Sequence, residues 1–142
     1  MSKQVQIEIV SPEHNILFSG QASYLVASGI LGELAVYPGH APLLTALKPG
    51  SIRIVHEKNR EDIFYATGGI LEVQPNVVTI LADTVIRAAH LDEAAAKQAQ
   101  ASAEQTLSAR QADKDYATIA AELAQAVAQL QVIQRWRKQL KT

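Results

Sequence analysis

The chain has 142 residues, enough for one domain of ordinary size or for a small domain with an appendage. Its formal net charge is −1 at pH 7, which excludes recruitment by overall charge to nucleic acid or to an anionic membrane. It has no cysteine, which excludes disulfides, thiol nucleophiles and thiolate metal sites. No stretch approaches the roughly 20 apolar residues of a membrane span. We therefore expect a soluble cytoplasmic protein that reaches a membrane only through a partner.

Residues 4–83 show the two-residue periodicity of β-strands, interrupted by turn residues. Near the start, Val5, Ile7 and Ile9 occupy alternate positions, as one buried face of a strand requires. Two polar stretches, residues 57–60 and 74–76, predict hairpin turns. Many short strands at even spacing, with no helical period between them, indicate an antiparallel sandwich or barrel.

Near Asp83 the periodicity changes to that of helices, and from Leu91 onward there is no proline or glycine. Two helices are predicted, separated by residues 110–115, where Asp113 is a candidate N-cap. The first helix offers mainly alanine, so its packing buries little apolar area. The second places larger apolar residues near one stripe: Tyr116, Ile119, Leu123, Val127, Leu130, Ile133 and Leu140. The simplest arrangement is a hairpin folded back on itself, and weak docking makes a switch between folded and extended states the alternative.

Basic residues crowd the end of the second predicted helix, where Arg135, Arg137 and Lys138 follow a stretch with Glu122 as its one charged residue. Complementation of the helix dipole and solubility at a carboxyl terminus explain this crowding without any partner. The functional interpretation is a basic tip that docks on an acidic partner. The residues alone leave both interpretations open.

No catalytic constellation is present in the sequence. The histidines His14, His40, His56 and His90 are scattered, without metal-ligand spacing, so we expect no metal site. Glycine-bearing stretches match neither a phosphate loop nor a dinucleotide fingerprint. Asp83 and Arg87 are spaced to pair across one helical turn, which favours a structural role at the junction between the two halves.

Two segments, GELAVYPGHAPLLTALKPG at residues 32–50 and GGILEVQPNVVTILAD at residues 68–83, resemble the epsilon subunit of F-type ATP synthases. The resemblance extends over the whole chain. It implies a β-sandwich of about ten antiparallel strands at residues 1–87 and a C-terminal α-helical hairpin at residues 88–142. It also implies a non-catalytic rotor subunit of the central stalk, on the cytoplasmic face of the bacterial inner membrane, that couples the gamma subunit to the c-ring and inhibits ATP hydrolysis through its helices.

The resemblance also implies roles for particular residues. Loops around Glu33 and His40 would face the c-ring, although His40 by itself looks like an ordinary turn histidine. The helical pair would either fold against the sandwich or extend into the catalytic head. Arg135, Arg137 and Lys138 would then meet acidic groups of the alpha and beta subunits.

Some members of this family bind ATP through a motif at the start of the first helix, and here the matching run is residues 91–96. Leu91, Asp92 and Ala96 fit the motif, but Ala95 stands where the motif has arginine. Without that guanidinium the strongest phosphate-facing group is missing. We therefore expect weak or absent ATP binding and no cofactor.

Two rival interpretations have distinct tests. A stand-alone β-sandwich adaptor with a helical tail would keep the fold but would not copurify with a gamma subunit. An enzyme would need a site assembled from distant residues such as Glu33, His40 and Asp83, and hydrolytic turnover by the purified chain would expose it.

Overall fold

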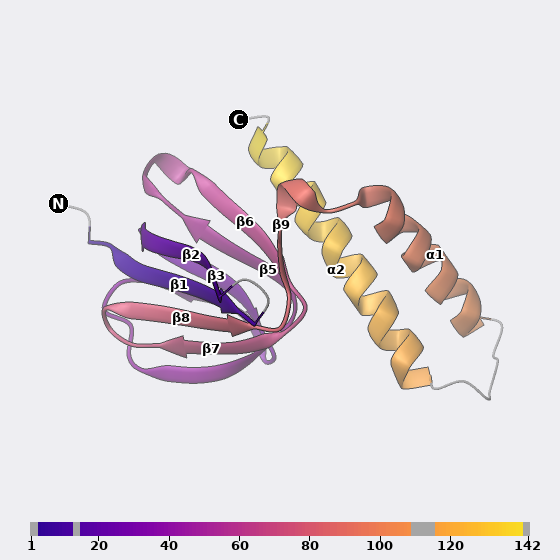
Figure 1. Cartoon of the computed structure of the whole chain (residues 1–142), viewed down its shortest axis with the longest axis horizontal. Coiled ribbons are helices and arrows are strands. Elements are labelled where there is room, and N and C mark those ends of the chain that lie inside the picture. The colour runs from indigo at the N-terminus through magenta and orange to yellow at the C-terminus, as the bar shows by residue number, and fades with distance from the viewer. Residues whose placement is uncertain (1–2, 13–14, 109–115, 141–142) are drawn as a thin grey trace.

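The protein is a β-sandwich joined to a helical hairpin, shown in a computed structural model that describes residues 3–12, 15–108 and 116–140 (Figure 1). The strands are β1 Val5–Ser11, β2 Asn15–Ala22, β3 Tyr24–Gly29, β4 Gly32–Val36, β5 Leu43–Val55, β6 Glu61–Ala66, β7 Gly69–Val73, β8 Val77–Ala82 and β9 Val85–Arg87. The helices are α1 Glu93–Ser108 and α2 Tyr116–Leu140, and short 3-10 turns cover Glu57–Asn59 and Ala88–His90. The expected order of a strand-rich part followed by a helical hairpin is confirmed.

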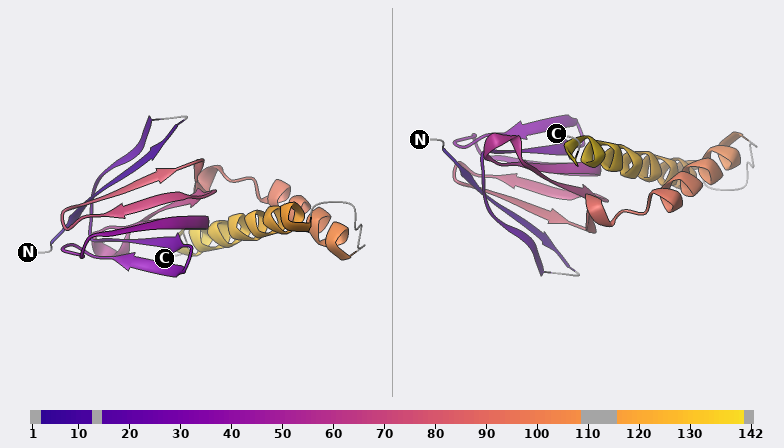
Figure 2. Two further views of the ribbon diagram at one scale, coloured as in Figure 1. Left: turned by 90° about the horizontal axis from the view of Figure 1, so that it is seen from below. Right: turned by 90° about the horizontal axis from the view of Figure 1, so that it is seen from above.

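The strands form two layers that share β5, as the views from below and above show (Figure 2). Residues Leu43–Leu47 of β5 pair with β7, whereas Gly50–Val55 pair with β6. A Cβ atom at position 50 would lie 2.5 Å from Oγ of Ser28, so glycine permits the close approach of β3 where β5 changes layer. One long strand thus links both halves of the sandwich.

The core between the layers follows the alternation seen in the sequence. Val5, Ile7 and Ile9 of β1 are buried, and the residues between them are partly exposed. Leu25, Ile54 and the other members of this cluster come from residues 5–85, so the main core contains no helical residue. The sandwich therefore has a hydrophobic core of its own.

The details of the sheet differ from the expectation in three ways. The described residues form nine strands rather than about ten, and β1 pairs with β8 in parallel rather than antiparallel. The prediction that the helical period begins near Asp83 was wrong, because Val85–Arg87 form β9, which pairs with β6. Val85 and Ile86 are β-branched, and they favour extended backbone. Helix α1 begins only at Glu93.

The hairpin is folded, with α1 and α2 side by side and α2 lying against β5 and β6 (Figure 1). A second apolar cluster joins α2 to the sandwich through Ile63, Tyr65, Ala88, Ala128 and Val132, with Leu91 and Trp136 packed on it. The predicted stripe is only partly buried: Ile133 is buried, Tyr116 and Leu140 are exposed, and the other members are half-buried. The other buried residues of α2 lie outside that stripe and are Ala126, Ala128 and Val132. The predicted N-cap Asp113 lies outside the described residues.

Candidate functional site

An exposed row of apolar side chains crosses five strands on the outer face of the sandwich. Ile16 of β2 lies opposite Val10 of β1, Val10 opposite Leu81 of β8, Leu81 opposite Ile70 of β7, and Ile70 opposite Ala46 of β5. Residues directly opposite on neighbouring strands point to the same face. We call Val10, Ile16, Ala46, Ile70 and Leu81 the apolar row.

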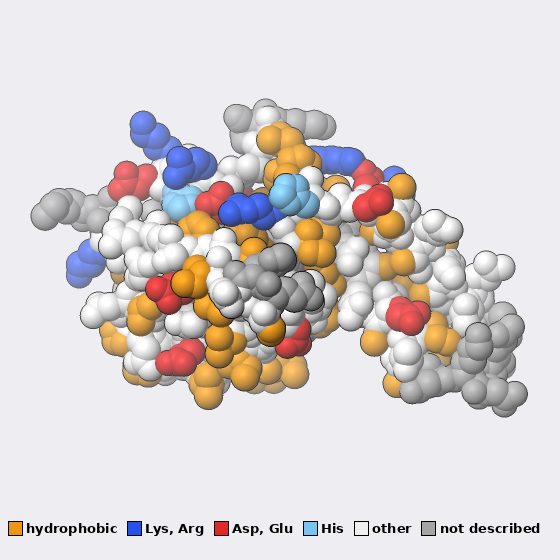
Figure 3. Space-filling view, in the orientation of Figure 1, with side chains coloured by type: hydrophobic (Ala, Val, Ile, Leu, Met, Phe, Trp, Pro, Cys, Tyr) orange, Lys and Arg blue, Asp and Glu red, His pale blue; other side chains and the backbone are white. Residues whose placement is uncertain are grey.

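The apolar row is accessible to a partner. Ile16, Leu81 and Ile70 are 60%, 50% and 45% exposed. The N–H of Ile30 donates to the carbonyl of Ala46 (3.0 Å), which continues the row to the β3–β4 turn, where Leu31 is 98% exposed. Hydrophobic side chains gather over the lower part of the sandwich in the space-filling view (Figure 3). Contiguous exposed apolar surface of this kind marks a protein–protein contact.

Glu33 and His40 lie at opposite ends of β4 rather than in one loop. Glu33 is the second residue of β4 and lines a groove between the sandwich and α2, together with Lys48 and Arg53. His40 follows β4 in the segment beside the β7–β8 turn, where the N–H of Gly39 donates to the carbonyl of Pro75 (2.9 Å). Strand β4 is at one end of the strand order. The two residues therefore share one sheet edge without forming a single cluster.

The ring of His40 has a fixed orientation. Its Nδ1 lies 2.6 Å from the carbonyl oxygen of Ala41, which makes Nδ1–H the donor and leaves Nε2 as an acceptor. The loop is stiffened by Pro38 and Pro42 on either side. His40 thus presents one hydrogen-bond acceptor in a defined direction.

Two of the three predicted tip residues form ion pairs inside the chain. Arg135 Nη2 lies 3.3 Å from Oε1 of Glu61, an oxygen that also accepts from Arg53 Nη1 at 2.5 Å. Arg137 pairs with Glu93, which also binds Lys97 at 3.1 Å. These contacts hold the pKa of Glu93 below its usual range, with Arg137 as the main cause. Lys138 is exposed.

The residues of the degenerate ATP motif have structural tasks in α1. Leu91 packs on the second apolar cluster, and Asp92 is the N-cap, because its Oδ1 accepts from the N–H of Ala95 (3.1 Å). Ala96 is buried against the hairpin interior, whereas Ala95 is exposed. The motif positions therefore have a folding role that needs no nucleotide.

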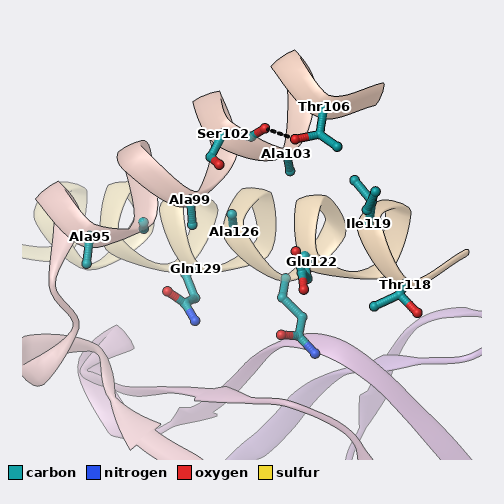
Figure 4. Close-up of a pocket in the computed structure, with 12 residues that line it drawn as sticks. Ala95, Ala99, Ser102, Ala103, Thr106, Thr118, Ile119, Glu122, Ala126 and Gln129 are labelled. Atoms are coloured by element: carbon teal, nitrogen blue, oxygen red, sulfur yellow. Dashed lines mark hydrogen bonds between the residues drawn. The ribbon is translucent and has the colours of Figure 1, made fainter. Parts of the chain in front are cut away.

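A cavity between α1 and α2 adjoins this motif (Figure 4). Its lining is made of small and neutral polar side chains, among them Ala95, Ala99, Ser102, Thr106 and Gln129, and the one ionisable group is Glu122. The close-up shows Thr106 bonded to the backbone of Ser102, since its Oγ1 donates to that carbonyl at 2.9 Å. None of the described residues that line the cavity is lysine or arginine. A phosphate chain would find no cation there.

Asp83 and Arg87 are not on one helical turn, so the spacing argument for an ion pair between them was wrong. Asp83 lies in the bend after β8 and donates its N–H to the carbonyl of Gly68 (3.1 Å). Arg87 ends β9, with its guanidinium carbon 5.0 Å from the ring centroid of Phe64. Extended backbone rises about 3.3 Å per residue, which separates side chains four positions apart.

The described residues contain neither a metal cluster nor a membrane-spanning helix. No group of three or more His, Asp or Glu side chains in this part of the chain is placed to hold a metal ion. Among the same residues, neither helix is both long and apolar enough to cross a membrane.

Sequence reasoning missed the sandwich residues that hold α2. Glu61 is 74 positions from Arg135 in the chain, and no local pattern announces their contact. Tyr65 was assigned only to a strand, yet it is fully buried beneath α2. The one available signal was the run of consecutive apolar residues from Ile63 to Ala66, which indicates a strand covered on both faces.

The exposed apolar row is typical of the class of protein that works by binding partners in an assembly. Two family models match the chain: the β-sandwich domain of the ATP synthase delta/epsilon chain at residues 4–88, and its long α-helix domain at residues 90–134. The chain therefore belongs to the ATP synthase delta/epsilon family, among the epsilon subunits, which are non-catalytic stalk subunits.

Curated relatives agree over the full length. An ATP synthase epsilon chain of Legionella pneumophila (strain Corby) is 54% identical over 141 residues, covering 99% of this chain and 100% of the relative. An ATP synthase epsilon chain of Chromohalobacter salexigens is 53% identical over 133 residues, covering 94% of each.

Solved structures share the fold at lower sequence identity. A chain of the Euglena gracilis mitochondrial ATP synthase, in a structure of its OSCP/F1/c-ring, matches with a TM-score of 0.71 at 20% identity, covering 96% of this chain and 81% of that one. A chain of the Tetrahymena thermophila mitochondrial ATP synthase, in a structure of its central stalk and c-ring, matches with a TM-score of 0.51 at 20% identity, covering 74% and 92%.

Proposed function

We propose that the sandwich joins the gamma subunit to the c-ring in the central stalk of a bacterial F-type ATP synthase, and that the hairpin restrains ATP hydrolysis. The observation that carries the first part is the apolar row. It crosses β2, β1, β8, β7 and β5 and offers the contiguous apolar surface that a lasting subunit contact needs. Its occupant in this proposal is the gamma subunit.

The c-ring contact runs in this proposal along the β4 edge, from Glu33 to His40. Glu33 offers an exposed carboxylate, and His40 offers the Nε2 acceptor of an oriented ring. Such groups make directed hydrogen bonds to polar loops. The protein would thereby be a peripheral component on the cytoplasmic face of the bacterial inner membrane, bound through the complex.

The proposed inhibitory role depends on Arg135 and Arg137, which bind one set of partners in the folded hairpin and another set in the extended hairpin. In the folded hairpin Arg135 and Arg137 pair with Glu61 and Glu93. When the hairpin extends, these cations become free for acidic groups of the alpha and beta subunits, with Lys138 beside them. Both arginine side chains are about half exposed, and Glu61 keeps its contact with Arg53 when Arg135 leaves, so exchange of one set of partners for another costs little.

The degenerate motif and the cavity beside it do not bind nucleotide in this proposal. The cavity carries Glu122 and no described cation, and the motif arginine is replaced by Ala95. A carboxylate in this cavity would repel a phosphate chain.

The gamma contact is tested by charging the apolar row. Ile70→Asp/Leu81→Asp places two carboxylates in the proposed interface, and we expect the affinity for purified gamma subunit to fall at least about tenfold. Ala89→Asp/Ala94→Asp is the matched control, because both alanines are exposed and lie outside the sandwich. Calorimetric titration measures both. Equal binding by the two variants would contradict the proposed surface.

A further inference from the structure

The end of α2 and the β5–β6 turn enclose a groove in which cations outnumber anions four to one. Its charged lining residues are Arg53, Lys58, Arg60, Glu61 and Arg135, and its amide lining residues are Asn59 and Gln139. None of its lining residues is shared with the cavity between α1 and α2. It is a separate feature, on the side of α2 that faces the sandwich.

The two arginines of the groove are held in place yet keep free donors. Both contact the same oxygen, Oε1 of Glu61, at 2.5 Å from Arg53 and 3.3 Å from Arg135. The Glu61 side chain is 9% exposed, so its carboxylate lies at the buried side of the groove. Its contacts with both guanidinium groups fix their positions. A guanidinium has five N–H donors, and one contact each leaves most of them available.

Lys58 and Arg60 form the outer rim of the groove. Both are exposed, and neither forms an ion pair with any described residue. Gln139 donates to the carbonyl of Asn59 at 3.3 Å, which holds the turn against α2. The single carboxylate inside the groove therefore leaves an excess of three positive charges around one opening.

We propose that this groove is a binding site for a phosphate-class oxyanion, either a free polyphosphate or the phosphate chain of a nucleotide. A phosphate-class anion carries several acceptor oxygens and more than one negative charge. It can therefore accept hydrogen bonds from several convergent guanidinium and ammonium groups at once, which a single carboxylate cannot. Arg135 comes from α2, whereas Arg53, Lys58 and Arg60 come from the sandwich. The complete site exists only while the hairpin is docked, so the bound anion stabilises the docked state.

Binding of the anion does not depend on the proposed inhibitory role, but its consequence for hydrolysis rests on that role. If the hairpin is the inhibitory arm, an anion that holds it down favours the active enzyme. If the chain binds the anion but its hairpin has no effect on hydrolysis, the binding site is supported and only the proposed effect of the anion on ATP hydrolysis is refuted.

The test is a titration of the full chain with sodium tripolyphosphate, followed by the amide NMR signals of residues 58–61 and of Arg135. We expect saturable shifts that weaken with added salt. Lys58→Ala/Arg60→Ala should raise the dissociation constant at least about tenfold, because two charge-assisted contacts are lost. Lys3→Ala/Lys48→Ala removes the same charge from exposed positions outside the groove and should change it less than about twofold.

Parallel titrations with ATP and with hexa-aspartate separate the occupants. Equal binding of ATP and tripolyphosphate assigns the site to the phosphate chain alone, and tighter ATP binding adds a contact to the base or sugar; both support the site. Tighter binding of hexa-aspartate would overturn it in favour of an acidic protein segment. Chemical shift changes that do not saturate would also overturn the proposed site, as would an equal loss of tripolyphosphate affinity in both double variants.

Discussion

Tyr65 is fully buried beneath α2, and its hydroxyl makes no hydrogen bond. Burial raises the pKa of this phenol, and the side-chain amide of Gln129, which lies nearby without the geometry of a hydrogen bond, offsets part of the effect. A buried polar group without a partner costs about 1–3 kcal/mol, a cost that disappears when water reaches it. The docked hairpin therefore carries a built-in penalty that favours release.

Removal of that hydroxyl should strengthen docking. Tyr65→Phe keeps the ring in the second apolar cluster and is expected to stabilise the docked hairpin by about 1 kcal/mol, which slows amide hydrogen exchange in α2. Tyr37→Phe is the control, because Tyr37 is exposed, stacks on Tyr24, and belongs neither to the second cluster nor to the groove at the end of α2. Unchanged or faster exchange in Tyr65→Phe would show that the hydroxyl is not a burden on docking.

Glu93 makes docking depend on pH. Its pKa is lowered in the docked hairpin, so its stabilisation is complete above the ordinary carboxyl pKa of about 4.3 and is lost as the pH falls through the lower docked value. We expect the fluorescence of Trp136, the one tryptophan, to report undocking in this acid range. In Glu93→Gln the change over that range should be smaller; an identical acid transition would contradict the role of the Arg137 pair.

At this scale the sequence predicted only local relationships. Asp92 falls at the start of the first predicted helix, and the structure shows that it caps this helix through the N–H three positions further on. The contacts of Arg135 with Glu61 and of Gln139 with Asn59 join residues 74 and 80 positions apart, which no local pattern encodes. The basic tip was visible in the sequence, but its partners within the chain were not.

Helix α2 is held to the sandwich by a small apolar contact. Its members from α2 are Ala128 and Val132, which meet Ile63 and Tyr65 of β6, with Trp136 at the edge. Alanine offers little area at roughly 25 cal/mol per Å², so this contact is easily outweighed by another partner. Helix α2 is therefore held to the sandwich by little apolar area, whereas the sandwich has a full core of its own.

A charge in this contact should release α2 without unfolding the sandwich. Val132→Asp buries an unpaired carboxylate and is expected to cost the docked state about 3 kcal/mol or more. Gln131→Asp introduces the same group at the exposed neighbouring position and should leave docking intact. Limited proteolysis compares them. Equal protection of α2 in both variants would mean that the second cluster does not hold the hairpin.

Periodicity predicted the existence and type of most elements but not every boundary. The alternation in β1 and the long proline-free helices were clear because each pattern repeats over several positions. Strand β9 was not predicted, since three residues are too few to show a period. The change of layer within β5 was not predicted either, because it depends on the contact of Gly50 with Ser28 from another strand.

The whole molecule combines an independent sandwich with an arm that depends on it. The main core lies entirely in residues 5–85, and the contact of the arm uses a separate cluster. A chain that ends after Ala89 keeps every residue of the main core, so the sandwich should fold and bind gamma without its helices. Sequence patterns showed this division into two parts; the partners came only from the family resemblance, because no single residue pattern names them.

The most direct test of the account is ATP hydrolysis by the reconstituted catalytic head with the full-length chain and with the chain truncated after Ala89. We expect truncation to raise the hydrolysis rate severalfold, because the arm that carries Arg135, Arg137 and Lys138 is gone while the sandwich that we propose to bind gamma remains. Equal rates with both chains would contradict an inhibitory arm.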